Sequence, residues 1–428
     1  MKVNLTEDRG WKRTLEIELP AEKVDEQFDL FQEKYRKKAK IKGFRPGKAP
    51  LEIVKEKYKD AIARDVLDSL IPKIFQDAIK QTNLSPITVP IVKELDFDYG
   101  KPLKVKAELE VIPEFEPKDY QGVKLVRKVS EITEKEVERA LDYLREKNAQ
   151  LRAVERESKS EDFLVLDLER TMLDDQKKKP EKFTNQLVQL GSQNIFKEFQ
   201  EGLEKTKAKD QKKIELTYAQ DYFEKKLAGK KAHFNIEVKE VKEKVLPELN
   251  DDFAKSLGDY QDLNQLKNRI KEDLERKAKE DSETRLKSDL IQKIVEVNSF
   301  EVPGSMVQRY LDAAVNDFKK QYDKVDEEKI REQYRSIGTD RIRWNLIYHR
   351  LAEKEKMDTE PQEIEEWTKA FAKNYNLEIN KAKEFLAKNR EIENIKDTIL
   401  EEKVLNYLLG KAEITEEKIK PAQGEKTK

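Results

Sequence analysis

Apolar and polar residues alternate in the stretch KRTLEIEL, residues 12–19. A period of two places Leu15, Ile17 and Leu19 on one face, which is typical of a half-buried β-strand. After Pro20 the apolar residues recur at steps of three and four, the spacing of one helix face. The residues of this stripe are Val24, Phe28, Phe31 and Tyr35. A strand followed by a helix is therefore predicted at the start of the chain.

The same strand and helix spacings of apolar residues continue to residue 112, so the first module is predicted to end there. A second helix is predicted from Pro50, with an apolar stripe continuing through Leu67–Phe75. Strand-like stretches return near Ile87–Leu95 and Leu103–Val111. Residues 1–112 are thus predicted to form an α+β domain.

The remaining chain divides by the same criterion. Residues 113–152 are interpreted as a linker and crossover helix, extended at Ile112–Pro117 because proline disfavours helix at the residue before it, and helical over Glu134–Glu155. Strand-like stretches such as FLVLDLERTML and HFNIEVKEV predict a small sheet domain over 153–245. Residues 246–415 show almost only helical stripes, and the polar tail 416–428 is predicted to be disordered.

Composition narrows the class of protein. Charged residues make up 41% of the 428 residues, yet the net charge is −1, which argues against a general nucleic-acid or membrane-surface protein. The chain has no cysteine, so disulfides, thiolate metal sites and thiol nucleophiles are excluded. We find no signal peptide or membrane span. A multidomain cytoplasmic protein, without direct DNA binding, is the expectation.

Motifs for familiar chemistry are missing. GFRPGK resembles a phosphate loop, but three residues separate Gly43 from Gly47 and Ala49 replaces the required hydroxyl residue. The two histidines, His233 and His349, lie in different modules, and no HExxH or EF-hand pattern is present. We therefore expect no cofactor and no metal.

The clearest local charge asymmetry surrounds that same loop. Its basic residues, with no acid between them, are Lys34, Arg36, Lys37, Lys38, Lys40, Lys42, Arg45 and Lys48. A charge run is usually a solvated helix end, but Phe44 between two glycines is poorly placed to join the helix stripe. An exposed aromatic residue beside arginine is typical of an interface anchor.

The loop GFRPGKAP, residues 43–50, resembles the ribosome-binding signature of trigger factor, a bacterial chaperone at the polypeptide exit tunnel. The resemblance extends over essentially the whole chain, through LEIELPAEKVDEQFD, ELEVIPEFE, LPELNDDFAKSLG, VPGSMV and EEKVLNYLLGKAEITEE. It implies an α+β docking domain, an FKBP-like antiparallel β domain and an elongated all-α body with arms. It also implies that Phe44, Arg45 and Lys48 contact the large ribosomal subunit, although Pro46 stands where some members have a basic residue. Dimerisation off the ribosome is known in the family, and the sequence does not decide it here.

The resemblance assigns a prolyl pocket to the middle domain. Its matching positions are Ile195, Phe196, Phe199, Tyr222 and Phe234, with Phe199 in place of the usual tryptophan. Several positions depart from the family: Leu168 replaces an aromatic residue, Lys205 and Lys209 replace glycines, and residues 174–180 replace the segment that brings a phenylalanine and an aspartate. Because an FKBP-type site works by apolar enclosure of the prolyl ring, we expect weak or absent isomerase activity.

The helical body is expected to hold nascent unfolded polypeptides without ATP. Candidate contact residues are Met306, Val307, Tyr310, Phe318, Tyr322, Trp344 and Phe371, although helical stripes more often face a core. Two other classes stay open: an enzyme whose principal activity is prolyl isomerisation, and a scaffold or RNA-binding protein using the basic loop. The pocket departures weigh against the first, and the near-zero net charge weighs against the second.

Overall fold

The computed structural model describes residues 1–38, 41–42, 44, 47–173, 179–192, 195–222, 224–322, 324–388 and 391–419. The chain divides into two compact units. The first joins residues 1–127 to 283–417, and the second contains residues 128–282 and the chain from Lys418 onward. None of the helices in the described ranges has the length and apolar character needed to cross a bilayer.

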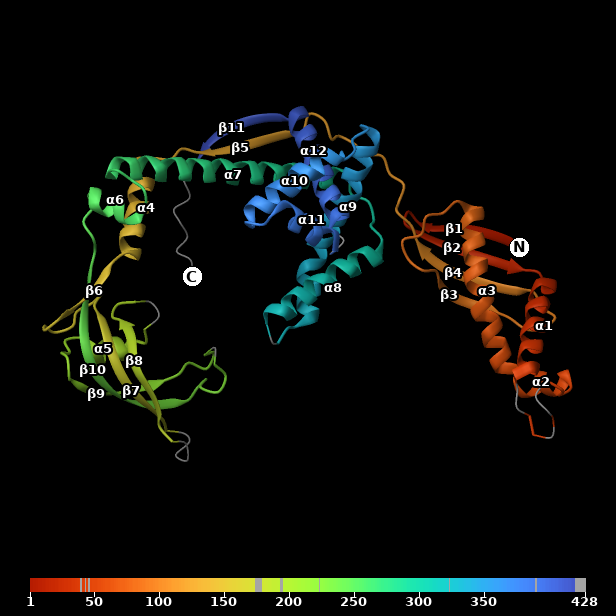
Figure 1. Ribbon diagram of the computed structural model, residues 1–428, viewed down its shortest axis with the longest axis horizontal. Helices are drawn as coiled ribbons and strands as arrows, with labels where there is room; N and C mark the ends of the chain where they lie inside the picture. Colours follow the sequence, from red (N-terminus) through yellow and green to blue (C-terminus); the bar gives the residue numbers. More distant parts are fainter. Residues whose placement is uncertain are drawn as a thin grey trace. The chain divides into compact units, whose positions relative to one another are not determined.

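The first unit begins with an antiparallel sheet in the order β1-β2-β4-β3. Its strands are β1 (Lys2–Arg9), β2 (Lys12–Leu19), β3 (Ile91–Asp96) and β4 (Leu103–Glu110). Its helices are α1 (Ala21–Lys38), α2 (Leu51–Lys57) and α3 (Lys59–Thr82), with α3 packed on β1 and β2 (Figure 1). Ile17 pairs with Val105 and both are buried, which confirms the predicted face of β2. Strand β1 was not predicted, because its side chains are nearly all exposed and do not alternate.

The rest of the first unit is mainly helical. Its helices are α8 (Gly304–Gln321), α9 (Glu327–Lys354), α10 (Pro361–Asn374), α11 (Ile379–Lys388), α12 (Ile392–Lys411) and the end of α7 (Leu263–Val297). Trp344 and Tyr348 of α9 form the centre of a core that includes Leu290 of α7 and Leu408 of α12. Residues 112–117 form no helix or strand, and Phe115 stacks on Phe300 with 4.1 Å between ring centroids.

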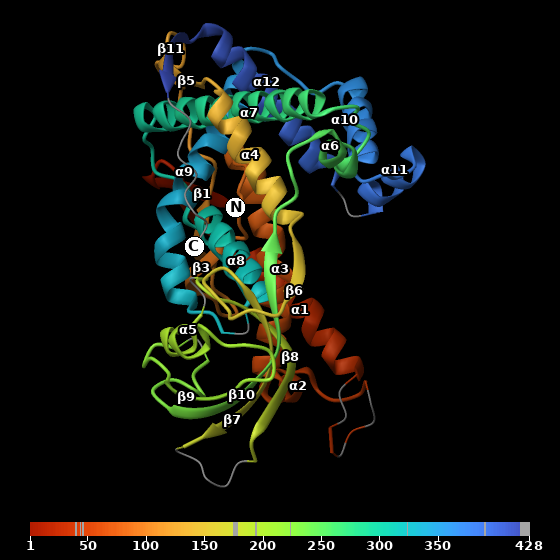
Figure 2. The ribbon, with the colours of Figure 1, turned by 90° about the vertical axis from the view of Figure 1, so that its left-hand side faces the viewer.

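The prediction of a helical body is confirmed except at its last three residues, whereas the prediction of a disordered tail is wrong over residues 416–419. Strand β11 (Glu413–Ile419) pairs with β5 (Lys124–Ser130), and the pair lies next to α7 (Figures 1 and 2), where Lys293 Nζ donates to the carbonyl of Lys124 over 2.6 Å. The Thr415 hydroxyl donates to the carbonyl of Leu125 over 3.3 Å. The strand is polar on its exposed side, which explains why composition indicated a loose tail. Residues 420–428 lie outside the described ranges.

The second unit is built on an antiparallel sheet in the order β6-β10-β7-β8, with β9 paired to the same β10. Its strands are β6 (Gln150–Val154), β7 (Phe163–Met172), β8 (Glu181–Gln189), β9 (Gln211–Thr217) and β10 (Lys231–Val245). Its short helices are α4 (Glu134–Lys147), α5 (Lys197–Leu203) and α6 (Asp251–Leu257). One sheet face is apolar, and α5 packs beside β9 against it.

The single helix predicted over Glu134–Glu155 is wrong at its end. Helix α4 stops at Lys147, where the Asn148 side chain donates to the carbonyl of Leu144 over 2.7 Å. The chain then forms β6, in which Leu151 pairs with Lys244 of β10. Pairing with a distant strand overrides the helical pattern at this point.

Candidate functional site

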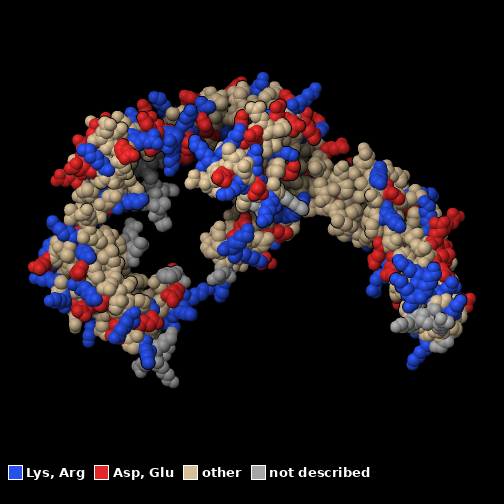
Figure 3. Space-filling view, in the orientation of Figure 1, with Lys and Arg blue, Asp and Glu red and all other residues tan. Residues whose placement is uncertain are grey.

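The cation-rich loop connects α1 to α2. Arg36, Lys37 and Lys38 form the last turn of α1, where cations suit the negative end of the helix dipole. Ile41 and Ala49 are buried, so they anchor the two ends of the described loop to the core. Lys and Arg side chains gather at this end of the module (Figure 3).

Phe44 and Lys48 lie between those anchors and are exposed, with 40% of the Phe44 surface accessible. The Phe44 amide donates to the carbonyl of Ile41 over 3.1 Å. Gly47 has a φ of +83°, in the left-handed region that favours glycine. The third predicted docking residue, Arg45, lies outside the described residues, and so do residues 43 and 46. An aromatic ring and a cation are therefore accessible on this loop.

The five residues predicted to form a prolyl pocket lie together on the apolar side of the second unit's sheet. The Phe199 and Phe234 rings meet edge-on at 5.0 Å between centroids, and both residues are buried. Phe196 contacts Phe199 at 6.4 Å and Tyr222 at 6.0 Å, while Ile195 packs against the same cluster. Burial raises the pKa of Tyr222, so its phenol stays neutral at ordinary pH.

Tyr218 belongs to this cluster and sequence reasoning missed it. Its ring lies 4.8 Å from Tyr222 and 5.8 Å from Phe196, and 3% of the residue is exposed. The sequence could have indicated this residue, because Tyr218 follows Ile214 and Leu216 at the two-residue spacing that places side chains on one face of a strand.

A guanidinium adjoins the aromatic cluster. Arg170 lies on β7 opposite Phe234, and its Nη1 donates to the Tyr218 hydroxyl over 3.2 Å. It is paired with Glu181 and lies 5.4 Å from the centre of the Phe183 ring. A charged side chain is thus fixed beside the rings that would enclose a proline.

The expected departures from the FKBP pattern have structural counterparts. Lys205 and Lys209 have φ values of 59° and 76°, a region that glycine adopts far more readily. Each amide is nevertheless paired: that of Lys205 donates to the carbonyl of Ser158 over 3.0 Å, and that of Lys209 donates to the carbonyl of Val238 over 2.6 Å. Leu168 is half-buried against the core. Residues 174–178 lie outside the described ranges.

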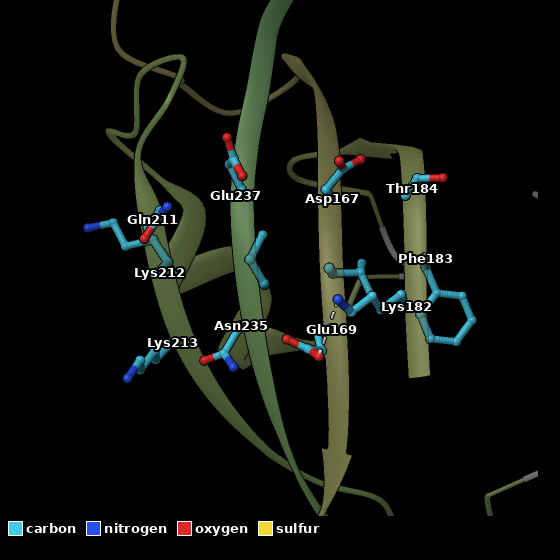
Figure 4. Close-up of a pocket in the computed structure, with 12 residues that line it drawn as sticks. Asp167, Glu169, Lys182, Phe183, Thr184, Gln211, Lys212, Lys213, Asn235 and Glu237 are labelled. Carbon is cyan, nitrogen blue, oxygen red and sulfur yellow. Dashed lines mark ion pairs between the residues drawn. The ribbon is translucent and has the colours of Figure 1, made fainter. Parts of the chain in front are cut away.

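A pocket of about 400 Å³ in this unit lies on the opposite face of the sheet (Figure 4). Strand alternation explains this placement, because Phe234 points to the core while Asn235 and Glu237 point outward. Glu169 and Lys182 form an ion pair across it at 3.9 Å. Its charges are mixed and it shares no ring with the aromatic cluster, so it is distinct from the predicted prolyl pocket.

Five of the predicted client-contact residues lie on or just beyond α8. Val307 is buried, whereas Phe318 is half-buried and Tyr322 is 58% exposed. Tyr310 and Phe318 line a cleft of about 310 Å³ with Tyr334 of α9, which sequence reasoning missed. The remaining residue, Met306, packs beside Val307. The end of this helix pair therefore presents aromatic surface.

A second aromatic surface lies on α10 and α11. Phe371 stacks between Trp367, at 5.5 Å, and Tyr375, at 4.7 Å. Tyr375 and Phe385 are 67% and 54% exposed. By contrast Trp344 is fully buried and its indole donates to Glu401, so this predicted contact residue belongs to the core.

The two histidines contact separate carboxylates. His233 lies 3.0 Å from Glu215, and His349 lies 2.9 Å from Asp397. Within the described ranges no group of three or more His, Asp or Glu side chains is placed to hold a metal ion.

Three family models match the chain. The model of bacterial trigger factor protein matches residues 1–144, and that of the bacterial trigger factor C-terminus matches residues 262–410. The model of FKBP-type peptidyl-prolyl cis-trans isomerase matches residues 154–239, which contain the aromatic cluster.

Full-length relatives agree with these matches. A trigger factor of Geobacter sulfurreducens is 31% identical over 417 residues, covering 95% of this chain and 96% of the relative. One from Caldicellulosiruptor saccharolyticus is 32% identical over 424 residues, covering 95% of each chain. A solved trigger factor chaperone structure has the same fold, with a TM-score of 0.54 at 24% identity, covering 96% of this chain and 99% of the other.

Proposed function

The chain belongs to the trigger factor family of chaperones, with an FKBP-type domain, and on this premise we propose that it docks at the ribosomal exit tunnel and shields nascent polypeptides without ATP. The observation that carries the proposal is the exposed Phe44 beside Lys48 at the cation-rich end of the first module. An accessible ring flanked by cations suits a partner with an apolar pocket and negative groups. The proposed location is the cytoplasm, where ribosomes and emerging chains are present.

Co-sedimentation with ribosomes tests the docking. We expect the triple variant Phe44→Ala/Arg45→Ala/Lys48→Ala to lose binding. A matched control replaces one apolar residue, one arginine and one lysine on exposed surface of the same module: Leu30→Ala/Arg64→Ala/Lys23→Ala. Equal binding by both variants would contradict the proposed docking residues. Tight binding to protein-free ribosomal RNA would instead favour the RNA-binding alternative.

The aromatic surfaces of α8–α9 and α10–α11 are the proposed client contacts. Exposed rings on a highly charged helical body bind apolar segments weakly while the charges maintain solubility. We expect Tyr322→Ser/Phe385→Ser to suppress aggregation of an unfolded client less well than the wild-type chain. The buried Trp344 is excluded from this set.

For the FKBP-type domain we propose weak or absent prolyl isomerisation. Phe199 and Phe234 are committed to the core, and Arg170 places a charge beside the remaining rings. Isomerisation of an X-Pro peptide by the full chain tests this point. Turnover well above the uncatalysed rate would favour prolyl isomerisation as the principal activity.

Ribosome and nascent chains are the proposed partners, with self-association to a dimer off the ribosome, and without DNA. Sedimentation of the purified chain across a concentration series tests the dimer.

A further inference from the structure

The guanidinium of Arg170 lies at the border of the apolar sheet face that carries the aromatic cluster. Arg170 of β7 pairs in register with Phe234 of β10 on one side and with Glu181 of β8 on the other. Side chains of residues that are directly opposite each other in a sheet project to the same face. Phe234 is buried in the core, whereas 16% of the Arg170 side chain is exposed. The charge therefore stands between the rings and solvent.

The described residues hold the two ends of this guanidinium differently. Its Nη1 donates to the hydroxyl of Tyr218 over 3.2 Å, and Tyr218 is 3% exposed. Its Nη2 donates to the carboxylate of Glu181, whose side chain is 51% exposed. The Tyr218 contact thus fixes the guanidinium from the core side, and the Glu181 contact lies on the solvent side.

Glu181 occupies a position that another carboxylate can take. It is the first residue of β8, and its carboxylate reaches Nη2 from the half-exposed edge of the sheet. Ion pairs with a solvent-exposed partner contribute little to stability, so Glu181 can be displaced at small cost. An arginine fork binds a carboxylate through charge-assisted hydrogen bonds and favours two parallel ones. The group that fits this position is therefore a carboxylate that arrives from solvent.

The accessible rings of the cluster lie one tyrosine away from this position. Phe196 and Tyr222 are half-buried, with 6.0 Å between their centroids. The ring of Tyr218 contacts both, at 5.8 Å and 4.8 Å, and its hydroxyl binds Arg170. Successive Cα atoms of a peptide are 3.8 Å apart, so a residue next to a ring-bound proline can place its side chain beside the guanidinium.

The charge of that neighbouring residue decides whether Arg170 opposes or favours binding. A peptide with neutral residues beside the proline removes water from the guanidinium and returns no charge to it. An aspartate or glutamate beside the proline replaces the lost water, and also Glu181, with a carboxylate. The same arginine thus disfavours one class of prolyl peptide and favours the other.

We propose that Arg170 is a specificity-determining residue of the FKBP-type domain, which selects prolines that have an aspartate or glutamate next to them. The prolyl ring rests on Phe196 and Tyr222, and the acidic side chain takes the place of Glu181 at Nη2 of Arg170. The reaction rotates an amide bond, so no covalent bond forms or breaks. The inference rests on the proposed function for its ligand, a prolyl peptide, and assigns the weak turnover expected there to peptides with neutral flanks.

The test uses the full chain and three peptides of equal length, centred on Glu-Pro-Gln, Gln-Pro-Glu and Gln-Pro-Gln. Glutamine matches glutamate in size without its charge. Exchange NMR measures the cis–trans rate, and titration measures the affinity. We expect the better of the two acidic peptides to exceed the neutral one about tenfold in kcat/KM and in affinity at low salt. The difference should shrink as the salt concentration rises.

Two variants should change this preference in opposite directions. Arg170→Leu should abolish the preference for the acidic peptide without weakening binding of the neutral one. Glu181→Gln removes the competing carboxylate and should raise the affinity for the acidic peptide about threefold. Arg152→Leu is the matched control, because that side chain is 72% exposed and pairs with Glu243. Thermal midpoints of all three variants check that the domain is folded.

Three outcomes would overturn the assignment: equal values for the acidic and neutral peptides, a preference that survives in Arg170→Leu, or no gain in Glu181→Gln. Ribosome co-sedimentation and aggregation suppression by the same samples keep the proposals apart. If both persist while the acidic preference is absent, only the role of Arg170 is rejected. If the neutral peptide turns over well above the uncatalysed rate, the proposed weak activity is rejected, whichever peptide is preferred.

Discussion

Arg170 donates a hydrogen bond to the hydroxyl of Tyr218 over 3.2 Å, which holds a guanidinium against the aromatic cluster of the FKBP-type domain. In an FKBP-type site, catalysis depends on apolar enclosure of the prolyl ring. A fixed charge beside the rings opposes that enclosure, because its hydration would be lost as the substrate enters.

Replacing Arg170 by leucine should therefore raise isomerase turnover. We expect kcat/KM on an X-Pro peptide to increase about fivefold, at a stability cost of about 1 kcal/mol from the unpaired Tyr218 hydroxyl. Arg152→Leu is the control, since that side chain is 72% exposed and pairs with Glu243 away from the cluster. A decrease in turnover would show that Arg170 assists the reaction.

Two contributions to ribosome binding are expected from the loop: one from Phe44 that does not depend on salt, and one from Lys48 that does. Phe44→Ala should weaken ribosome binding about thirtyfold at every ionic strength, as loss of an aromatic anchor worth about 2 kcal/mol would do. Lys48→Ala should weaken it mainly at low salt, because screening already reduces that contact at high salt. Binding measured from low to high salt distinguishes the two, and parallel curves for both variants would contradict this division.

The pH dependence of the FKBP-type domain should depend on Asp162. Burial of this carboxyl favours its neutral form, but the Arg156 guanidinium at 2.9 Å and the Lys159 amide at 3.0 Å outweigh burial and hold its pKa below the usual range. A depressed folded-state pKa gives stability that is fully present above the unfolded value of about 4 and is lost as pH falls through the folded value.

Asp162→Asn should accordingly destabilise the domain at neutral pH, and its difference from the wild-type chain should shrink as the pH falls below about 4. Urea unfolding at a series of pH values measures both effects. Glu198→Gln, on the exposed side of α5, should leave the curve unchanged. If the difference in unfolding free energy between the variant and the wild-type chain grew as the pH fell, the pKa of Asp162 would be raised and not lowered by folding.

Strand β11 should be needed for the stability of the helical body. Its Glu413 amide donates to the carbonyl of Val123 over 3.0 Å, and Ile414 packs against the core that contains Trp344. Deleting residues 413–428 should lower the urea midpoint and expose β5 to proteases, whereas deleting 420–428 should change neither. Equal stability of both truncated chains would contradict this role.

Much of the fold was predictable from short-range periodicity. The face of β2 with Leu15 and Ile17, and the stripe of α1 with Phe28, follow directly from the spacing of apolar residues. Strands β1, β6 and β11 were missed because their stability comes from backbone pairing with distant strands, as between Leu151 and Lys244. Backbone hydrogen bonds do not require an alternating pattern of side chains, so the sequence does not indicate them.

Some features of the candidate site were likewise predictable from the sequence, and others were not. The family motif indicated the positions of Phe196, Phe199 and Phe234, and the structure brings their rings together. No local pattern could indicate that Arg170 reaches Tyr218, because the contact joins residues 48 positions apart. Likewise, the burial of Trp344 depends on three helices that meet only in the folded chain.

The pairing of β5 with β11 also has a consequence during synthesis. Thr415 and Leu125, which are joined by a hydrogen bond, are 290 residues apart. At the usual rate of elongation, β5 is synthesised roughly 15–60 s before its partner strand. A newly made copy thus carries an open strand edge for that interval, and so is itself an incomplete chain of the kind that a nascent-chain chaperone shields.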